Sequence, residues 1–458
     1  MQSPVLLRTD IADIRRQRRE AQAIACFAAA AFTVSPFAGA WAIDADDDLD
    51  LITDTVASQE LRRDWIEATR RGARAVDQAD RGFAAPDGFR LGNFFIYPSI
   101  TETIAYDSNI YGLAQDPVAD WRFITAPELT IQSQLPRHVF EMNVFGRFMN
   151  FAENTDQNYA NFGGRARGAL HIDHAHTLSF SMSARRDHEE RSAVTASQLA
   201  AEPVPVDLYR ASVGLTRDVG RLYGTISATA EKIDFRNVPE IGGGTLNQDN
   251  RDQEVYLAQI DAGYRISPGF DFVTTVRGVK QFNEPEAPGL QNRNSAGYDL
   301  LAGLAFESDP LVRWRLLAGY GERDYERSDL GTVGSSLLEA NVTWLATQRF
   351  TLSANASRAI DGEFGADDEG RIITTGSIKG DYEIRHDLFA SANVGLADIS
   401  FIGSTREDEV FEAGASLQYY YTKNMVFGLG YTFEKRNSNE ADFDFDRSIV
   451  RVSGTLRF

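Results

Sequence analysis

The last ten residues, 449–458, read "IVRVSGTLRF", and this stretch decides the fold that the sequence predicts. Every second residue is apolar or small, and the residues between are polar; the first set is Val450, Val452, Gly454, Leu456 and Phe458. A period of two places the two sets on opposite faces of a β-strand. Soluble domains usually end in frayed polar residues. A final strand with one apolar face that ends on phenylalanine therefore predicts a sheet that faces a nonpolar environment.

The same alternation runs through almost every window from about Asn93 onward. It is clear in "HTLSFSMSAR" (176–185), "VRWRLLAGY" (312–320) and "MVFGLGYTFE" (425–434). These stretches run for about ten to fifteen residues, whereas strands of soluble sheets usually have about five or six. The length matches the nine to eleven residues that a tilted membrane-spanning strand needs, with some overhang.

Turn signals divide this region into units of about 40 residues. Tight turns are predicted near Pro136, His174, Val219, Pro268, Pro310, Gln348, His386 and Lys423. Longer polar segments lie midway between them, such as 189–207 and 361–370. Nine hairpins joined by eight short turns predict an all-β, up-and-down antiparallel transmembrane barrel of about 18 strands (16–18), with both chain ends on the short-turn side. A propeller repeats at a similar length but uses four short strands per unit; a large soluble β-protein is the other alternative.

Composition excludes two classes of protein. A mean hydropathy of −0.31 and 24% charged residues do not fit a helical membrane protein. The net charge of −20 disfavours nucleic acid as a partner, because phosphates would be repelled.

The N-terminus has the plan of a secretory signal peptide. Four arginines between residues 15 and 19 precede the apolar run 23–34, a Ser-Pro breaker and the small-residue site "AWA" (40–42). We predict cleavage after Ala42. The only cysteine, Cys26, lies inside this segment; a lipoprotein cysteine is the alternative interpretation. The remaining chain would carry 41 basic and 63 acidic residues, a net charge of −22.

Three segments are expected: a signal peptide (1–42), an acidic helical or disordered periplasmic extension (43–87) and an outer-membrane barrel (88–458). The middle segment begins with "DADDDLDL" and continues with good helix formers but few apolar anchors. An exposed lead-in is the simpler interpretation, and a docking helix or plug is the alternative.

The alternation also assigns side chains to the lumen. The charged candidates are Glu141, Arg147, Arg185, Arg210, Asp261, Arg265, Asp271, Arg277, Asp299, Arg313, Arg315, Glu339 and Glu412. Charges of both signs cannot face lipid cheaply, so they predict water inside. Two interpretations are open for each of these residues. It can belong to a cross-lumen network that only stabilises the wall, or it can contact a solute. Outward aromatic residues near strand ends, such as Trp314, Trp344 and Tyr421, predict girdles at the lipid headgroups.

Other motifs carry little chemistry. "HIDHAH" (171–176) falls on a short turn without further ligands, and "IGGG" (241–244) lacks the strand and helix of a phosphate cradle. No local sign of a catalytic triad is present, so we expect no enzyme activity, no cofactor and no metal site.

The first hairpin adds a family resemblance. Its residues Gly88, Gly92, Phe94, Pro98, Tyr106, Asp107, Asn109, Pro127 and Leu129 follow a pattern that resembles the start of the second "putative beta-barrel porin" family of Gram-negative bacteria. The match is specific over roughly 50 residues. The resemblance implies an outer-membrane barrel, in a family with several members near exopolysaccharide synthesis and export systems.

Two local expectations come from the same hairpin. Pro98 and Pro127 should lie near each other across the first two strands, and proline cannot donate to the ladder, so we predict a local bulge there. Tyr106, Asp107 and Asn109 should lie at the outer end and build the turn.

The sequence thus predicts an outer-membrane channel with periplasmic termini that passes a hydrophilic solute or polymer, as an accessory of surface-polysaccharide export. The alternatives are a general diffusion porin and a non-conducting structural or adhesion barrel. Expected partners are outer-membrane lipid and lipopolysaccharide, together with polysaccharide and periplasmic export proteins. Val450, Val452, Leu456 and Phe458 resemble the C-terminal signal that the outer-membrane insertion machinery reads.

Overall fold

The computed structural model describes residues 86–283, 293–309, 311–327, 330–362 and 369–458. In this part of the chain, eighteen long strands of 12 to 16 residues form one antiparallel sheet. They are β2 (Phe94–Asp107), β3 (Asp120–Ser133), β4 (His138–Phe151), β5 (Tyr159–His171), β6 (His176–Glu189), β7 (Val204–Val219), β8 (Leu222–Phe235), β11 (Gln253–Ser267), β12 (Phe270–Asn283), β13 (Ser295–Asp309), β14 (Val312–Tyr325), β15 (Thr332–Thr347), β16 (Phe350–Asp361), β17 (Arg371–Arg385), β18 (Leu388–Phe401), β19 (Glu407–Thr422), β20 (Met425–Ser438) and β21 (Phe445–Arg457).

Short elements complete the structure. They are β1 (Phe89–Leu91), the loop hairpin β9 (Val238–Pro239) with β10 (Thr245–Leu246), and the single 3-10 turns η2 (Thr155–Gln157), η3 (Asp249–Arg251) and η4 (Ala441–Phe443). None of the helical segments described is long and apolar enough to cross a membrane.

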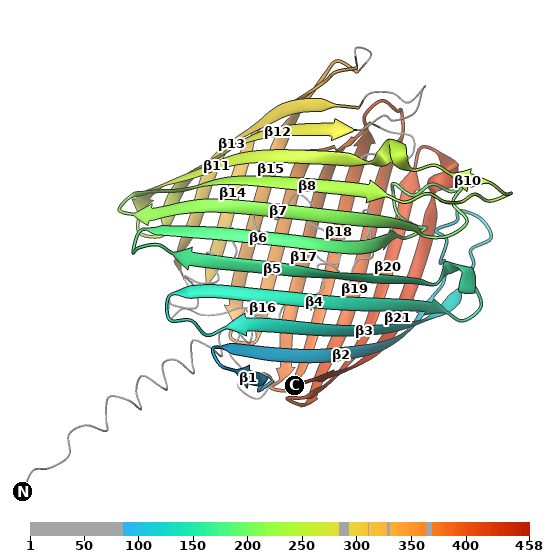
Figure 1. The fold of residues 1–458 in the computed structure, drawn as a ribbon, viewed down its shortest axis with the longest axis horizontal. Coiled ribbons are helices and arrows are strands. Elements are labelled where there is room, and N and C mark those ends of the chain that lie inside the picture. Colours follow the sequence, from blue (N-terminus) through green and yellow to red (C-terminus); the bar gives the residue numbers. More distant parts are fainter. Residues whose placement is uncertain (1–85, 284–292, 310, 328–329, 363–368) are drawn as a thin grey trace, which may run out of the picture.

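The sheet closes on itself. Each long strand pairs with its neighbours in the sequence, and β2 also pairs with β21 over nine residues, from Ser99↔Arg457 to Asp107↔Ile449. The all-β, eighteen-stranded antiparallel barrel predicted from the alternation is therefore confirmed (Figure 1). The expected extension 43–87 lies almost wholly outside the described residues.

Connections at the two ends of the barrel differ in length. One end, here the short-turn end, carries turns such as 220–221 and 348–349. Seven of the eight predicted turns fall at or next to the predicted position, and the eighth position, Pro310, lies outside the described residues. The other, the long-loop end, carries the longer segments, including 190–203 and 236–252. The register shifts by a β-bulge just before five of the short turns, in β11–β12, β13–β14, β15–β16, β17–β18 and β19–β20.

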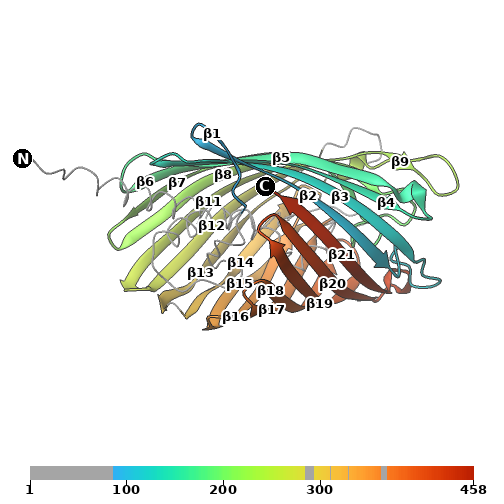
Figure 2. The same ribbon diagram turned by 90° about the horizontal axis from the view of Figure 1, so that it is seen from below.

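The barrel is flattened rather than round. Figure 2 shows β2–β8 as one broad, nearly flat wall, with the strands from β14 to β21 opposite. In Figure 1 the strands of the two walls cross steeply, as expected for strands that tilt about a common axis. β13 lies at an edge between the walls. There the inward-facing Gly303 and Gly319 have no room for a side chain, because an added Cβ would lie 1.8 Å from the carbonyl oxygens of Leu316 and Leu300.

The first hairpin contradicts one expectation. The β2–β3 register runs without a shift from Phe94↔Ser133 to Asp107↔Asp120, so the predicted bulge at Pro98 and Pro127 is wrong. Pro98 lies where β21 ends, and its carbonyl accepts the Phe458 N–H at 3.1 Å. Pro127 faces Gly146 on β4, whose added Cβ would lie 3.6 Å from the proline ring. Each proline sits where one ladder bond is absent, so neither strand has to bulge.

The first and last strands described, β1 and β21, both lie at this seam. β1 pairs with β2 at Phe89↔Ile96, in the place on the edge of β2 that β21 has left free. The Phe89 and Phe458 rings stack with centroids 6.5 Å apart. Inside the seam, the hydroxyls of Thr101 and Thr455 form a hydrogen bond of 2.9 Å.

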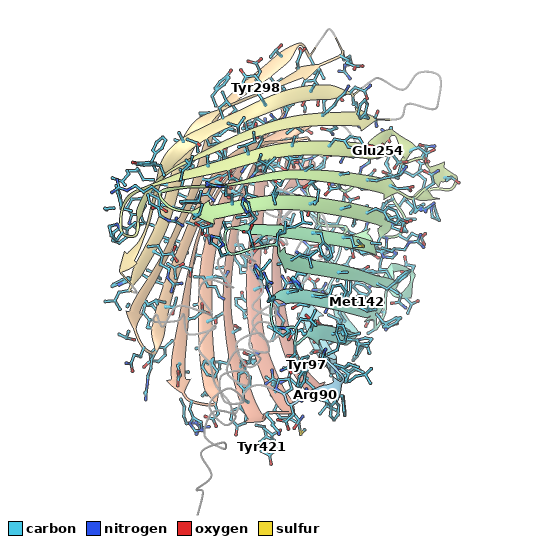
Figure 3. All side chains as sticks on the ribbon, turned by 60° about the vertical axis from the view of Figure 1, so that its left-hand side comes forward. Arg90, Tyr97, Met142, Glu254, Tyr298 and Tyr421 are labelled. Carbon is cyan, nitrogen blue, oxygen red and sulfur yellow. The ribbon has the colours of Figure 1, made fainter. Side chains whose placement is uncertain are left out.

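The outer surface is apolar between two aromatic belts. Exposed Ile226, Leu316 and Val394 lie in mid-strand, each on the face opposite buried neighbours. Tyr421 lies at the short-turn end of the outer surface and Glu254 toward the long-loop end (Figure 3). Predicted girdle residues such as Trp344 are exposed here. This band matches the lipid-facing belt of a membrane barrel.

Gly303→Ala should destabilise the barrel, because its methyl group collides with the Leu316 carbonyl. We expect the free energy of unfolding in urea, measured in lipid vesicles, to fall by about 2 kcal/mol. The control is Gly376→Ala on β17, where an added Cβ meets nothing within 4 Å. Equal losses for both variants would contradict the steric explanation.

Phe458→Asp should reduce the folded barrel in the membrane severalfold, because it removes the ring that stacks on Phe89 and places a charge beside lipid. Heat-modifiable mobility on gels measures the folded fraction. Phe89→Ala is the control, since it removes the stack but keeps the terminal aromatic ring. Normal insertion of Phe458→Asp would refute an assembly role for this residue.

Candidate functional site: a loop inside the barrel mouth

The thirteen charged residues predicted for the lumen lie on the strand face opposite the exposed apolar side chains. The structure joins several of them to one another. Arg277 contacts Glu339 at 2.6 Å and Asp299 at 3.9 Å, which ties β12, β13 and β15 together. Glu412 lies directly across from another carboxylate, Glu434 on β20.

The other predicted lumen residues bond mostly to partners that the prediction did not include. Three short ion pairs are Glu141–Arg167 at 2.7 Å, Arg185–Asp187 at 2.9 Å and Arg210–Glu231 at 3.1 Å. Further bonds are Arg265 to Asp218, Thr275 to Asp261, Tyr223 to Asp271 and, at 3.4 Å, Arg315 to Thr275. Arg147 and Arg313 point inward on β4 and β14. The wall is thus a network of paired charges.

The most distinctive feature of the lumen is the β6–β7 loop, residues 190–203, which we call the mouth loop. The loop connects two neighbouring strands of the wall, yet its middle is buried. Ser192 is 5% exposed, and Val194 and Thr195 are each 2% exposed. Val194 packs in one apolar cluster with Ile399 and Val410, on strands β18 and β19. Figure 2 shows β18 and β19 in the wall opposite β6 and β7. The contact of Val194 with that wall therefore takes the loop across the mouth of the barrel.

An ionic cluster anchors the start of this loop. Glu190 accepts bonds from Arg447 at 2.8 Å and Arg122 at 3.2 Å, and both arginines also bind Asp107, at 2.6 and 3.2 Å. Burial alone would raise the pKa of the Glu190 carboxyl, but the charges of Arg447 and Arg122 outweigh it and lower that pKa. Glu190 therefore stays ionised at neutral pH, and the anchor persists until the medium becomes strongly acidic.

Further contacts hold the loop on both sides. Arg436 on β20 donates to the Ser192 carbonyl at 3.2 Å, and Gln198 donates to the Asp442 carbonyl at 2.9 Å. Near the base, Glu189 accepts a bidentate pair of bonds from Arg251, at 2.6 and 2.9 Å. Arg251 is fully buried and its guanidinium lies 3.8 Å from the Phe235 ring centroid. Bidentate, desolvated pairs of this kind fix geometry well.

Other loops narrow the same end. Ile110 of the β2–β3 loop packs inside against Ile124 and Met149. From the β16–β17 loop, Glu369 pairs with Arg293 at 2.9 Å and with Arg327 at 2.5 Å. Several loops thus pack together at the long-loop end, and the mouth loop contacts the opposite wall there.

The polar groups at the mouth are engaged in structural pairs, and no three His, Cys, Asp or Glu side chains in the described ranges are placed to hold a metal ion. At the turn 171–176, Asp173 caps the backbone N–H of Ala175 at 2.7 Å and His176 at 2.9 Å.

Sequence reasoning assigned residues 189–207 to an ordinary outer loop and missed the mouth loop. A weak signal was available, because "SAVTA" (192–196) is more apolar than a solvated loop requires. The alternation places the anchors Arg122 and Arg447 on the inner face, but no local pattern marks them as loop contacts. Asp107 was assigned a structural role in a turn; its carboxylate does accept the Asn109 N–H at 3.0 Å.

Comparisons with solved structures find membrane barrels at very low identity. OpdK of Pseudomonas aeruginosa, solved with vanillate, is 11% identical, with 79% of this chain and 99% of that chain covered and a TM-score of 0.43. OpdO of the same organism is 12% identical, with 80% and 98% covered and a TM-score of 0.45. Its siderophore receptor PirA is 8% identical, with 82% and 81% covered and a TM-score of 0.42. No curated protein matches the chain.

The family comparison is much more specific. The model described as "Putative beta-barrel porin 2" matches residues 83–458, which include all of the described strands. This agrees with the resemblance seen in the first hairpin. The chain therefore belongs to the putative beta-barrel porin 2 family and is a porin-like β-barrel of the outer membrane.

Proposed function

We propose that this protein is a channel for hydrophilic solutes whose mouth loop sets the width of the passage. The observation that carries the proposal is the burial of Val194 against Ile399 and Val410, across a lumen lined by charged and polar side chains. An inward face with charges of both signs supports a water-filled interior. An eighteen-stranded barrel is wide enough for such a channel, and a loop across it restricts what passes.

We also propose the orientation. The long-loop end faces outward and the short-turn end, with both chain ends, faces the periplasm, as in other bacterial outer-membrane barrels. Export would use the signal segment 1–42, with cleavage after Ala42. Insertion would use the terminal residues Val450, Val452, Leu456 and Phe458 as the signal for the assembly machinery.

A second function has support from one wall of the lumen. Inward positions on β16, β17 and β18 carry neutral hydroxyls and amides in adjacent rows, and they are Ser353, Asn355, Ser357, Thr375, Ser377 and Asn393. Ser357 and Thr375 share a hydrogen bond of 2.7 Å. Such groups bind sugar hydroxyls without holding them tightly, so export of a surface polysaccharide is the finer proposal.

The channel proposal predicts measurable conductance. Purified protein in a planar bilayer should give discrete openings, and Glu190→Gln with Val194→Asp should raise single-channel conductance about twofold or more. Glu190→Gln removes the negative charge that pairs with Arg447, and Val194→Asp places a carboxylate in an apolar cluster. The loop should therefore leave the mouth. Glu254→Gln, on the outer surface, is the matched control. Silence at every voltage would support a structural barrel instead.

The export proposal is tested in cells. A strain that lacks the protein should lose most of its surface polysaccharide, measured as cell-bound and released sugar. Complementation with the native chain should restore it, and complementation with a chain that carries Asn355→Leu and Ser377→Leu should restore less. Undiminished polysaccharide in the deletion strain would remove this function while leaving the channel proposal intact.

A further inference from the structure

The lipid-facing side of the barrel carries a carboxylate well inside strand β2. Glu102 on β2 is exposed, and it alternates with the outward Ile100 and Ile104 rather than with the buried Ala105. Its neighbour Thr125 donates a hydroxyl to Glu102 Oε2 at 2.8 Å. In the described part of the chain, this is the one hydrogen bond to that carboxyl.

Glu102 lies inside the apolar band. The outward aromatic pair Tyr106–Trp121, with ring centroids 5.2 Å apart, is four residues nearer the long-loop end. Four residues of a tilted strand correspond to a depth of about 9 Å below that pair. An ionisable group facing lipid at this depth is costly and marks a functional site by default. A partner that supplies a charge would remove the cost.

The surface beside Glu102 is suited to close contact. Two strands away, β4 presents Gly146, next to the outward Pro127 on β3 and directly across from the exposed Phe162 on β5. Gly146 has no side chain, and such a residue lets a partner approach closely within a membrane, here between the exposed rings of Phe148 and Phe162. They lie in the broad flat wall of Figure 2, where a second flat wall can make contact over a wide area.

A basic residue lies on the other side of Gly146. The register runs from Ile100 through Pro127, Gly146 and Phe162 to Arg186 on β6. Arg186 on β6 is thus two strands from β4 on one side, and Glu102 on β2 is two strands from β4 on the other side. The guanidinium of Arg186 uses Nε and Nη2 for Asp207, at 2.6 and 2.7 Å, which leaves Nη1 outside that pair.

We infer that the β2–β6 wall is the contact surface of a symmetric dimer of this chain. A two-fold axis normal to the membrane and passing over Gly146 exchanges the two sides of the wall. The axis therefore brings Glu102 of each copy toward Arg186 of the other copy, so that the interface contains two such pairs. From ordinary strand spacings and tilts their Cα atoms fall about 7–10 Å apart in the plane of the contact, within reach of both side chains. A two-fold contact has to be self-complementary in this way.

The inference is independent of what the lumen transports. Charge pairing favours a second copy of this chain over lipid as the contacting partner. A second copy forms two acidic–basic pairs at the interface, whereas a lipid offers no ordered cation at this depth. The inference also explains why glycine stands at position 146. An added Cβ there would meet Phe148 at 3.4 Å, an ordinary contact, so the barrel itself does not require glycine.

Cysteine cross-linking tests the symmetry. The described residues contain no cysteine, so Cys26→Ala gives a clean background. In native outer membranes under mild oxidation, Gly146→Cys should form a disulfide-linked dimer, and Glu102→Cys with Arg186→Cys should do so more than either single change. The control Ala356→Cys, outward on β16, should stay monomeric. Linkage of Gly146→Cys to a different protein, or equal dimer from Ala356→Cys, would overturn the inference.

Charge reversal tests the complementarity. Glu102→Arg should raise the dimer dissociation constant about tenfold or more, measured by mass photometry in lipid nanodiscs. Glu102→Arg with Arg186→Glu should recover most of the loss, because both pairs form again with opposite sign. Gel mobility of the unheated protein confirms that each variant is folded. A native chain that remains monomeric in nanodiscs, or an unchanged dissociation constant for Glu102→Arg, would refute the dimer.

Discussion

The structure depends on one constraint: a backbone N–H or C=O that faces lipid has to be bonded within the protein. A hydrocarbon environment offers no water, so an open sheet edge cannot be tolerated there. The pairing of β2 with β21 satisfies this requirement and links residues more than 300 positions apart. The seam also explains its irregularities. Pro98, which has no N–H, stands where β21 ends, and β1 takes over the adjacent edge of β2.

Closure determines what the interior must be. Once the apolar side chains face lipid, their neighbours in the sequence point inward, and the charged residues there have to find partners. The pairs Arg277–Glu339 and Arg210–Glu231 join neighbouring strands in this way. At the mouth, the same requirement recruits the loop: Arg447 and Arg122 are nearly buried, and the carboxylates of Asp107 and Glu190 compensate both of them. The loop is therefore part of the charge balance of the wall, which is why it can be held across the lumen.

The flattened shape separates two surfaces. At the edge, Gly303 and Gly319 allow the sheet to bend sharply, because a side chain there would collide with a carbonyl of the next strand. The broad walls between the edges can then be nearly flat. Their inner faces approach each other closely enough for Val194 to reach Ile399 and Val410, and the outer face of β2–β6 can contact another flat surface.

The sequence by itself determined the strands, the short turns, the closing strand and the face on which each side chain lies. These features are local, because a period of two and a turn signal depend only on adjacent residues. Even so, local rules failed at Pro98 and Pro127, where a bulge was expected: whether a proline breaks a ladder depends on the facing strand. Only the tertiary structure decided that residues 190–203 fold inward, that Arg447 is their anchor and that Glu102 stands on a flat wall. The physical reason is that each of these depends on strands far away in the sequence, whose positions are set when the barrel closes.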